Sequence, residues 1–179
     1  MKIIDLLNKI ANGEEVPKKI HIRDLGKYTW QEDVKAYWSD VDENDLLYDL
    51  DKTGIKRIRY TTSHPRDLDE KTMMAMAECK SVMPQLHLPV QSGDDYILKK
   101  MNRKYTFEQY MSKVNRLKEL VPDLALTTDI IVGFPNETEE QFQNTLKLVK
   151  EAKFEGAFTF IYSKREGTPA AIMPDEVSE

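Results

Sequence analysis

Cysteine is almost absent from this chain, because Cys79 is the only one among 179 residues. A single thiol cannot form a disulfide within the chain, and it cannot build a metal site from several thiolates. Long apolar runs are absent too: no stretch of about eighteen apolar residues could cross a bilayer, and no signal-peptide pattern opens the sequence. The sequence therefore predicts a cytoplasmic protein, without a membrane partner and without metal ligands of its own.

An excess of positive charge is also missing. The chain has 26 lysines and arginines against 31 acidic residues, a formal net charge of -5. Such a balance provides no overall attraction to a polyphosphate, so any contact with RNA has to be local. With 40% hydrophobic residues, the chain can bury one sizeable core and is expected to form a single main domain.

Short β-rich segments alternate with longer helical ones between Gly54 and Ser163. Parallel βα units show this alternation. Helices usually start at a capping residue, which Thr106 supplies for one helix and Asn136 or Thr138 for another. The predicted strands are residues 57–62, 86–90, 125–132 and 157–162, and the predicted helices are residues 69–79, 107–121 and about 139–149.

The first third of the chain gives weaker signals. Residues 1–17 are expected to be an uncertain helical segment, and residues 18–25 a strand. Asn44 is expected to cap a helix that buries Leu46, Leu47 and Leu50. The fold class is accordingly α/β: residues 18–179 are predicted to form a partial (β/α) barrel of four to five parallel βα units.

In parallel α/β folds, ligands bind at the carboxyl ends of the strands. In this sequence, polar residues and glycines follow each predicted strand. They are Thr61 to His64, Gln91 and Ser92, Gly133 to Glu137, and Ser163 to Thr168. Gly93 has no Cβ, which suits a ligand that approaches the backbone, and an ordinary turn is the alternative. Asp129 lies inside an apolar strand, where a carboxylate needs a partner.

Five sequence blocks carry a resemblance to a known family. They are TSHPRD (62–67), HLPVQSG (87–93), MNRKYT (101–106), TTDIIVGFPNET (127–138) and YSKREGTPAA (162–171). In this order, they resemble the MiaB-type tRNA methylthiotransferases of the radical S-adenosylmethionine (SAM) superfamily. The resemblance covers roughly residues 55–179, and TSHP and GFPNET are closer to the tRNA branch than to the branch that modifies a ribosomal protein.

The resemblance implies a specific chemistry. Such enzymes bind a 4Fe-4S cluster through a CxxxCxxC loop and cleave SAM to a 5′-deoxyadenosyl radical. They then add a methylthio group to C2 of N6-isopentenyladenosine next to the anticodon in tRNA. This chain lacks CxxxCxxC, so it has no ligands for the cluster and is expected to be inactive alone.

Site residues follow from matching positions in the five blocks, and no catalytic residue is assigned. Arg103 is expected to meet the SAM carboxylate, because a guanidinium is well shaped for this contact. With Lys99, Lys100 and Lys104, Arg103 also forms a basic cluster, which is commonly a solvated helix end. The resemblance implies SAM binding by Gln91, Ser92, Arg103, Asp129, Gly133 and Glu137, and substrate binding by Ser63, His64, Ser163, Arg165 and Thr168.

Other interpretations remain open from the sequence. One is a non-catalytic truncated fragment that binds nucleotide or a partner protein. Another is an unrelated (β/α) barrel enzyme for a phosphorylated metabolite, but neither a late phosphate-binding loop nor an acid/base pair is evident. His64 and His87 are weak evidence for a metal site. An incomplete barrel has open strand edges, so we also expect self-association.

Overall fold

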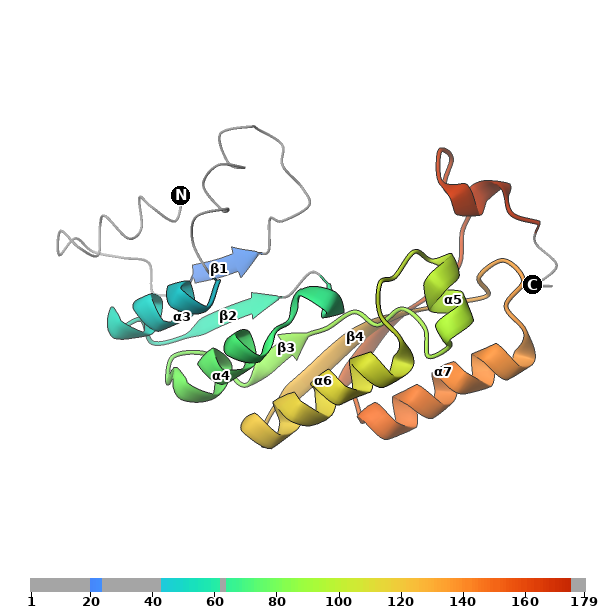
Figure 1. Cartoon of the computed structure of the whole chain (residues 1–179). Helices are drawn as coiled ribbons and strands as arrows, with labels where there is room; N and C mark the ends of the chain where they lie inside the picture. Colours follow the sequence, from blue (N-terminus) through green and yellow to red (C-terminus); the bar gives the residue numbers. More distant parts are fainter. Residues whose placement is uncertain (1–19, 24–42, 62–63, 175–179) are drawn as a thin grey trace. The chain divides into compact units, whose positions relative to one another are not determined.

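A computed structural model describes residues 20–23, 43–61 and 64–174 of the chain (Figure 1). The described residues form two compact units. The first unit contains the described residues up to Thr61 together with residues 70–84, and the second contains residues 64–69 and 85–174. The predicted helical segment at residues 1–17 lies outside the described residues.

The first unit contains two parallel strands and two helices. Strand β1 (Ile20–Arg23) pairs in parallel with β2 (Ile58–Thr61), and α3 (Glu43–Lys52) connects them in the sequence. Both strands and the helix agree with the sequence prediction, except that α3 begins at Glu43, so Asn44 is not its capping residue. The predicted burial of Leu46, Leu47 and Leu50 is confirmed.

The methionine-rich segment of the first unit forms α4 (Glu70–Glu78), which packs against α3. Met73 and Met76 are buried, and so is Cys79 just after the helix. Ser81 follows α4, and both its N–H and its hydroxyl donate hydrogen bonds to the carboxylate of Asp51 on α3, at 2.7 and 2.6 Å. These two bonds lower the pKa of Asp51. The methionines are thus core residues, as expected.

The second unit is built on a three-stranded parallel sheet in the order β3–β4–β5. Helices α6 and α7 lie along the sheet, and both are preceded by a threonine that caps them (Figure 1). The elements are η1 (Pro65–Asp67), β3 (Gln85–His87), α5 (Asp95–Lys100), α6 (Phe107–Leu120), β4 (Ala125–Val132), α7 (Glu139–Ala152), β5 (Gly156–Ile161) and η2 (Pro169–Ile172).

Both long helices begin with a capping box. Thr106 accepts a hydrogen bond from the N–H of Gln109, whose side chain accepts one from the N–H of Thr106. Thr138 and Gln141 form the same pair at the start of α7. Each box satisfies backbone donors that a helix start leaves without partners. The predicted capping of α6 by Thr106 is confirmed, and of the two candidates for α7 the structure selects Thr138.

Strand β3 is shorter than the predicted strand at residues 86–90, because Pro89 has no N–H for the sheet. After β3, side-chain hydroxyls take the place of the regular backbone hydrogen bonds between strands. Tyr110 donates to the Leu88 carbonyl at 2.9 Å, and Tyr105 donates to that of Val90 at 2.8 Å. The Thr128 hydroxyl accepts from the Val90 N–H at 3.0 Å. The chain therefore stays extended until Gln91, where it rejoins β4 through an isolated parallel bridge.

The two faces of this sheet differ in exposure. Along β4, Leu126, Thr128 and Ile130 are buried, whereas the alternate residues are partly exposed. In a barrel, the buried face packs on the helices and the other face points inward. Strand β5 leaves Phe158 and Phe160 exposed by 65% and 53%. The expected self-association through open edges stays a prediction.

Among the described residues, no helix is long and apolar enough to cross a membrane.

Candidate functional site

Three predicted site residues follow the carboxyl ends of the three strands in the second unit. Gln91 follows β3, Gly133 follows β4, and Ser163 follows β5. Because β3, β4 and β5 are all parallel, these three positions lie at the same edge of the sheet. The polar turns that the sequence predicted after these strands therefore lie at one end of the second unit, where parallel α/β folds bind ligands.

Gln91 has an uncommon backbone conformation, with φ at 75°. Residues other than glycine rarely adopt such positive φ values, and doing so costs about 1–3 kcal/mol. Two hydrogen bonds to β4 hold it there: its N–H donates to the Asp129 carbonyl at 2.8 Å, and its carbonyl accepts from Ile131 at 2.9 Å. A strained residue fixed at a strand end is a feature that clusters at ligand sites.

The inward face of the sheet carries a polar cluster directly before this edge. His87 lies beside Thr127 in the register of β3 and β4, and Phe158 lies beside Asp129 in the register of β4 and β5. The His87 Nε2 is 3.3 Å from the Asp129 Oδ1, and its Nδ1 is 3.0 Å from the Thr127 Oγ1. The Phe158 ring meets the imidazole edge-to-face, with centroids 6.2 Å apart.

The imidazole of His87 lies between two oxygen atoms. Its Nε2 faces the Asp129 carboxylate at ion-pair distance, and its Nδ1 shares a hydrogen bond with the Thr127 hydroxyl, the direction of which depends on the tautomer of the ring. Among the described residues, Oδ2 of Asp129 accepts no hydrogen bond, and 27% of the side chain is exposed. One carboxylate oxygen is thus held by the protein while the other can accept from a ligand.

The loop between β4 and α7 is closed by its own glutamate. Glu137 Oε2 accepts hydrogen bonds from the N–H groups of Gly133 and Phe134, at 2.6 and 3.3 Å. Gly133 has φ at 69°, a conformation that glycine adopts without strain. Burial raises the pKa of Glu137, although these two hydrogen bonds oppose the rise. Its Oε1 is buried and has no hydrogen-bond partner among the described residues.

Ser92 and Gly93 lie against α7. The Ser92 hydroxyl is fully buried and lies 3.3 Å from the Thr145 hydroxyl. A Cβ on Gly93 would come within 2.5 Å of the Asn144 carbonyl oxygen and 2.7 Å of the Thr145 Cα. The expectation that Gly93 leaves room for a ligand is therefore wrong, because the backbone of α7 occupies that space. Ser92 and Gly93 dock α7 onto the turn.

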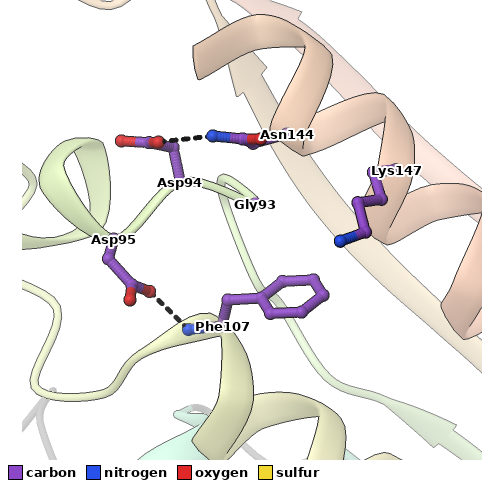
Figure 2. A pocket seen from close by; sticks show the side chains of 6 residues that line it. All are labelled: Gly93, Asp94, Asp95, Phe107, Asn144 and Lys147. Atoms are coloured by element: carbon purple, nitrogen blue, oxygen red, sulfur yellow. Dashed lines mark hydrogen bonds between the residues drawn. The ribbon is translucent and has the colours of Figure 1, made fainter. Parts of the chain in front are cut away.

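A small hollow of about 250 Å³ opens beside this turn, lined by Gly93, Asp94, Asp95, Phe107, Asn144 and Lys147. Figure 2 shows Asp94 and Asn144 pointing toward one another, joined by a hydrogen bond of 2.9 Å. Asp95 accepts from the Phe107 N–H at 2.6 Å. Both carboxylates therefore hold helices together, and the hollow is a packing feature of α5, α6 and α7.

The segment that contains His64 is pinned by a lysine from α6. The Lys113 ammonium donates to the carbonyls of Pro65, Arg66 and Leu68, at 2.8, 2.9 and 2.6 Å. His64 is buried, caps η1 by accepting from the Arg66 N–H, and contacts the Tyr105 ring. His64 thus supports the turn, and its predicted contact with substrate stays a prediction. Ser63 lies outside the described residues.

The remaining predicted residues lie in turns at the same end. Ser163, Arg165 and Thr168 are all exposed after β5, and the Thr168 hydroxyl donates to the Arg165 carbonyl. Arg103 follows α5, where its N–H donates to the Leu98 carbonyl at 2.8 Å. Their proposed contacts with substrate and with SAM stay predictions.

A family comparison decides the relationship. The Radical SAM superfamily model matches residues 21–149 of this chain, which is more than half of its length. The chain belongs to the radical SAM superfamily.

Solved radical SAM structures share the fold. A coproporphyrinogen III oxidase from Escherichia coli has a TM-score of 0.61 at 20% identity, covering 94% of this chain and 38% of its own. A methyltransferase from Kitasatospora setae has a TM-score of 0.63 at 14% identity, covering 95% and 32%.

Curated relatives within the superfamily are similar in sequence. A tRNA-2-methylthio-N(6)-dimethylallyladenosine synthase from Oceanobacillus iheyensis is 52% identical over 153 residues, covering 83% of this chain. A protein of the same name from Alkaliphilus oremlandii is 57% identical over 140 residues, covering 78%. The chain spans about 30% of the length of these relatives. The resemblance to tRNA methylthiotransferases seen in the five sequence blocks is confirmed.

The residues of this radical SAM chain do not fit a 4Fe-4S cluster. The only thiol, Cys79, is 4% exposed, and burial raises its pKa to about 11. A thiol in this environment is not a ready thiolate ligand. Among the described residues, no group of three or more histidine, cysteine, aspartate or glutamate side chains could hold a metal ion.

Sequence reasoning missed the partnership of His87 with Asp129. It predicted that Asp129 needs a partner, but it did not identify His87. A partial signal was available, because Thr127 and Asp129 occupy alternate positions in one predicted strand and so share a face of the sheet, but His87 belongs to another strand. Which strands are neighbours, and in which register, is set by tertiary packing.

Proposed function

We propose that this chain forms the SAM-binding part of a radical SAM tRNA methylthiotransferase domain. The observation that carries this proposal is the polar cluster of His87, Thr127 and Asp129, which lies beside exposed Phe158 on the inward face of the sheet. A partly exposed carboxylate suits the vicinal hydroxyls of a ribose, and an exposed phenyl ring suits the apolar surface of an adenosyl group.

Each residue has a separate role in this proposal. Asp129 accepts from the ribose hydroxyls, while His87 holds its carboxylate in place and Thr127 holds the imidazole of His87. Gln91 and Gly133 shape the edge of the sheet, and Arg103 pairs with the SAM carboxylate. Glu137 keeps the β4–α7 loop closed through its hydrogen bonds from Gly133 and Phe134. Ser92 acts indirectly, by holding the turn against α7.

If bound here, SAM would supply a sulfonium whose carbon–sulfur bond can break when it receives one electron from an external donor. The residues of this chain bind and orient the ligand, but they do not provide the electron, because they cannot hold the cluster. We infer that the chain alone does not carry out the methylthiolation. The names of the relatives support N6-isopentenyladenosine in tRNA as the substrate of the domain, with Ser63, His64, Ser163, Arg165 and Thr168 as candidate contacts.

The competing proposal is a non-catalytic fragment that binds a partner protein instead of SAM. Calorimetric titration of the chain with SAM separates the two. We expect a dissociation constant on the order of 1 mM or lower, and a loss of affinity of about tenfold or more in Asp129→Asn, because hydrogen bonds to a charged acceptor contribute about 1.5–3 kcal/mol.

Asp123→Asn is the matched control, because Asp123 is exposed in the turn that precedes β4 and is not part of the polar cluster. No heat up to several millimolar SAM would remove the proposal. An equal loss of affinity in Asp129→Asn and Asp123→Asn would remove the assigned role of Asp129.

A further inference from the structure

A cluster of cations lies beside the candidate site, although the chain as a whole is acidic. The basic patch consists of Lys99, Lys100, Arg103 and Lys104, in the last turn of α5 and the turn that follows. None of these four residues forms a salt bridge within the described part of the chain. Strand β3 leads through Gln91 directly into α5, so the basic patch belongs to the same end of the sheet as the candidate site.

The backbone fixes the basic patch rigidly. Asn102 has φ at 58°, its N–H donates to the Lys99 carbonyl at 3.0 Å, and the Arg103 N–H donates to the Leu98 carbonyl at 2.8 Å. These two bonds form a Schellman turn, which ends a helix in a defined geometry. The buried side chains of Ile97 and Leu98 anchor α5 to the core. The cations are therefore presented from a fixed position.

An exposed aromatic side chain accompanies these cations. Tyr96 is 53% exposed, and the Lys100 ammonium lies 5.3 Å from the centre of its ring. Tyr96 is three and four residues before Lys99 and Lys100 on α5, which makes these three side chains neighbours on one side of the helix. An exposed ring next to several cations is the arrangement by which proteins bind single-stranded nucleic acid, with bases stacked on the ring and phosphates paired with the cations.

The acidic residues of the same segment are occupied elsewhere. Asp94 Oδ1 caps α5, and its Oδ2 binds Asn144. Asp95 binds the N–H of Phe107, at the start of α6. Both carboxylates lie at the amino end of α5, whereas the cations lie at its carboxyl end. The charge of the basic patch is therefore not neutralised by direct ion pairing.

We propose that the basic patch and Tyr96 form a contact surface for a single-stranded RNA loop, which they hold next to the SAM-binding edge. This inference rests on the proposed function, because it specifies where that domain meets its RNA. The cations pair with phosphates without reading sequence, and Tyr96 stacks on one unpaired base. Helix α5 thus brings an extruded nucleotide close to the ends of β3 and β4.

Fluorescence anisotropy with a labelled anticodon stem–loop RNA tests this surface on the full chain. The patch variant is Lys99→Gln/Lys100→Gln/Lys104→Gln, which keeps Arg103 because that residue is a SAM-binding candidate. The control variant Lys56→Gln/Arg57→Gln/Lys150→Gln removes the same charge from exposed positions elsewhere. Circular dichroism of both variants checks that they are folded.

We expect the patch variant to bind the RNA at least about tenfold more weakly, with a salt slope smaller by about 2 in log–log units, since each phosphate contact contributes about 0.7. Tyr96→Ala is expected to weaken binding by about tenfold, with a nearly unchanged salt slope. The control variant is expected to stay within about twofold of the unchanged chain.

Three results would overturn the proposal: no RNA binding by the unchanged chain, equal losses in the patch and control variants, or equally tight binding of poly-glutamate, which would indicate an acidic protein partner. SAM calorimetry on the same preparations separates this inference from the proposed function. A patch variant that keeps its SAM affinity and loses RNA supports the surface. A chain that binds SAM but no RNA overturns the surface alone.

Discussion

Replacing Gly93 with alanine is expected to lower the free energy of unfolding by about 3 kcal/mol, because overpacking a rigid contact costs about 1–3 kcal/mol or more. The new Cβ would lie 2.5 Å from the Asn144 carbonyl oxygen and 2.7 Å from the Thr145 Cα. Both are backbone atoms of α7, so no side-chain rotation relieves the overlap. Helix α7 would have to move away, breaking the hydrogen bond from the Gly93 N–H to the Thr145 hydroxyl.

Urea unfolding followed by circular dichroism measures this loss. Gly156→Ala is the matched control, since a Cβ on Gly156 would meet only the Thr127 methyl group, at an ordinary distance of 3.7 Å. We expect this control to change the free energy of unfolding by less than about 1 kcal/mol. If the two alanine variants were equally stable, the tight contact between the Gly93 turn and α7 would be wrong.

Replacing Lys113 with methionine is expected to cost about 2 kcal/mol of stability. Its ammonium binds three carbonyl oxygens in the segment from Pro65 to Leu68, and hydrogen bonds from a charged donor contribute about 1.5–3 kcal/mol when buried. The value for the whole set is smaller than the sum because the lysine is partly exposed and water can replace part of the interaction. Methionine keeps most of the aliphatic packing.

The same substitution at Lys118 provides the comparison. Lys118 is also on α6 and also partly exposed, but its ammonium binds a single carbonyl, that of Ala152. We expect Lys118→Met to cost at most about 1 kcal/mol in the same urea titration. If Lys118→Met lowered the free energy of unfolding more than Lys113→Met, Lys113 would not be the residue that holds the His64 segment in place.

Elements with strong local signals were predictable from the sequence. Strand β4 matches its predicted range of 125–132, and α6 begins after Thr106 as predicted. A continuous apolar run and a capping box are local features, so they need no knowledge of the rest of the fold. Helix α5 was missed as an element because its six residues are too few to show a helical period, and its cap depends on Asp94.

The site was predictable only in part, because some of its features follow from local sequence and others depend on tertiary contacts. The positions of Gln91, Gly133 and Ser163 follow from strand ends, and the parallel sheet brings them to one edge. The role of Gly93 did not follow, because the approach of α7 is a tertiary contact more than fifty residues away in the sequence. The His87–Asp129 pair likewise depends on the register between β3 and β4, which alternation alone does not determine.

The central claim is that the ends of β3, β4 and β5 form one face that binds an adenosyl ligand. A two-dimensional NMR titration of the ¹⁵N-labelled chain with S-adenosylhomocysteine tests it most directly. We predict that the saturable amide shifts concentrate at Gln91, Asp129, Gly133 and Phe158, and that the first unit stays unaffected. Saturable shifts confined to α3 and α4, or no saturable shifts at millimolar ligand, would contradict it.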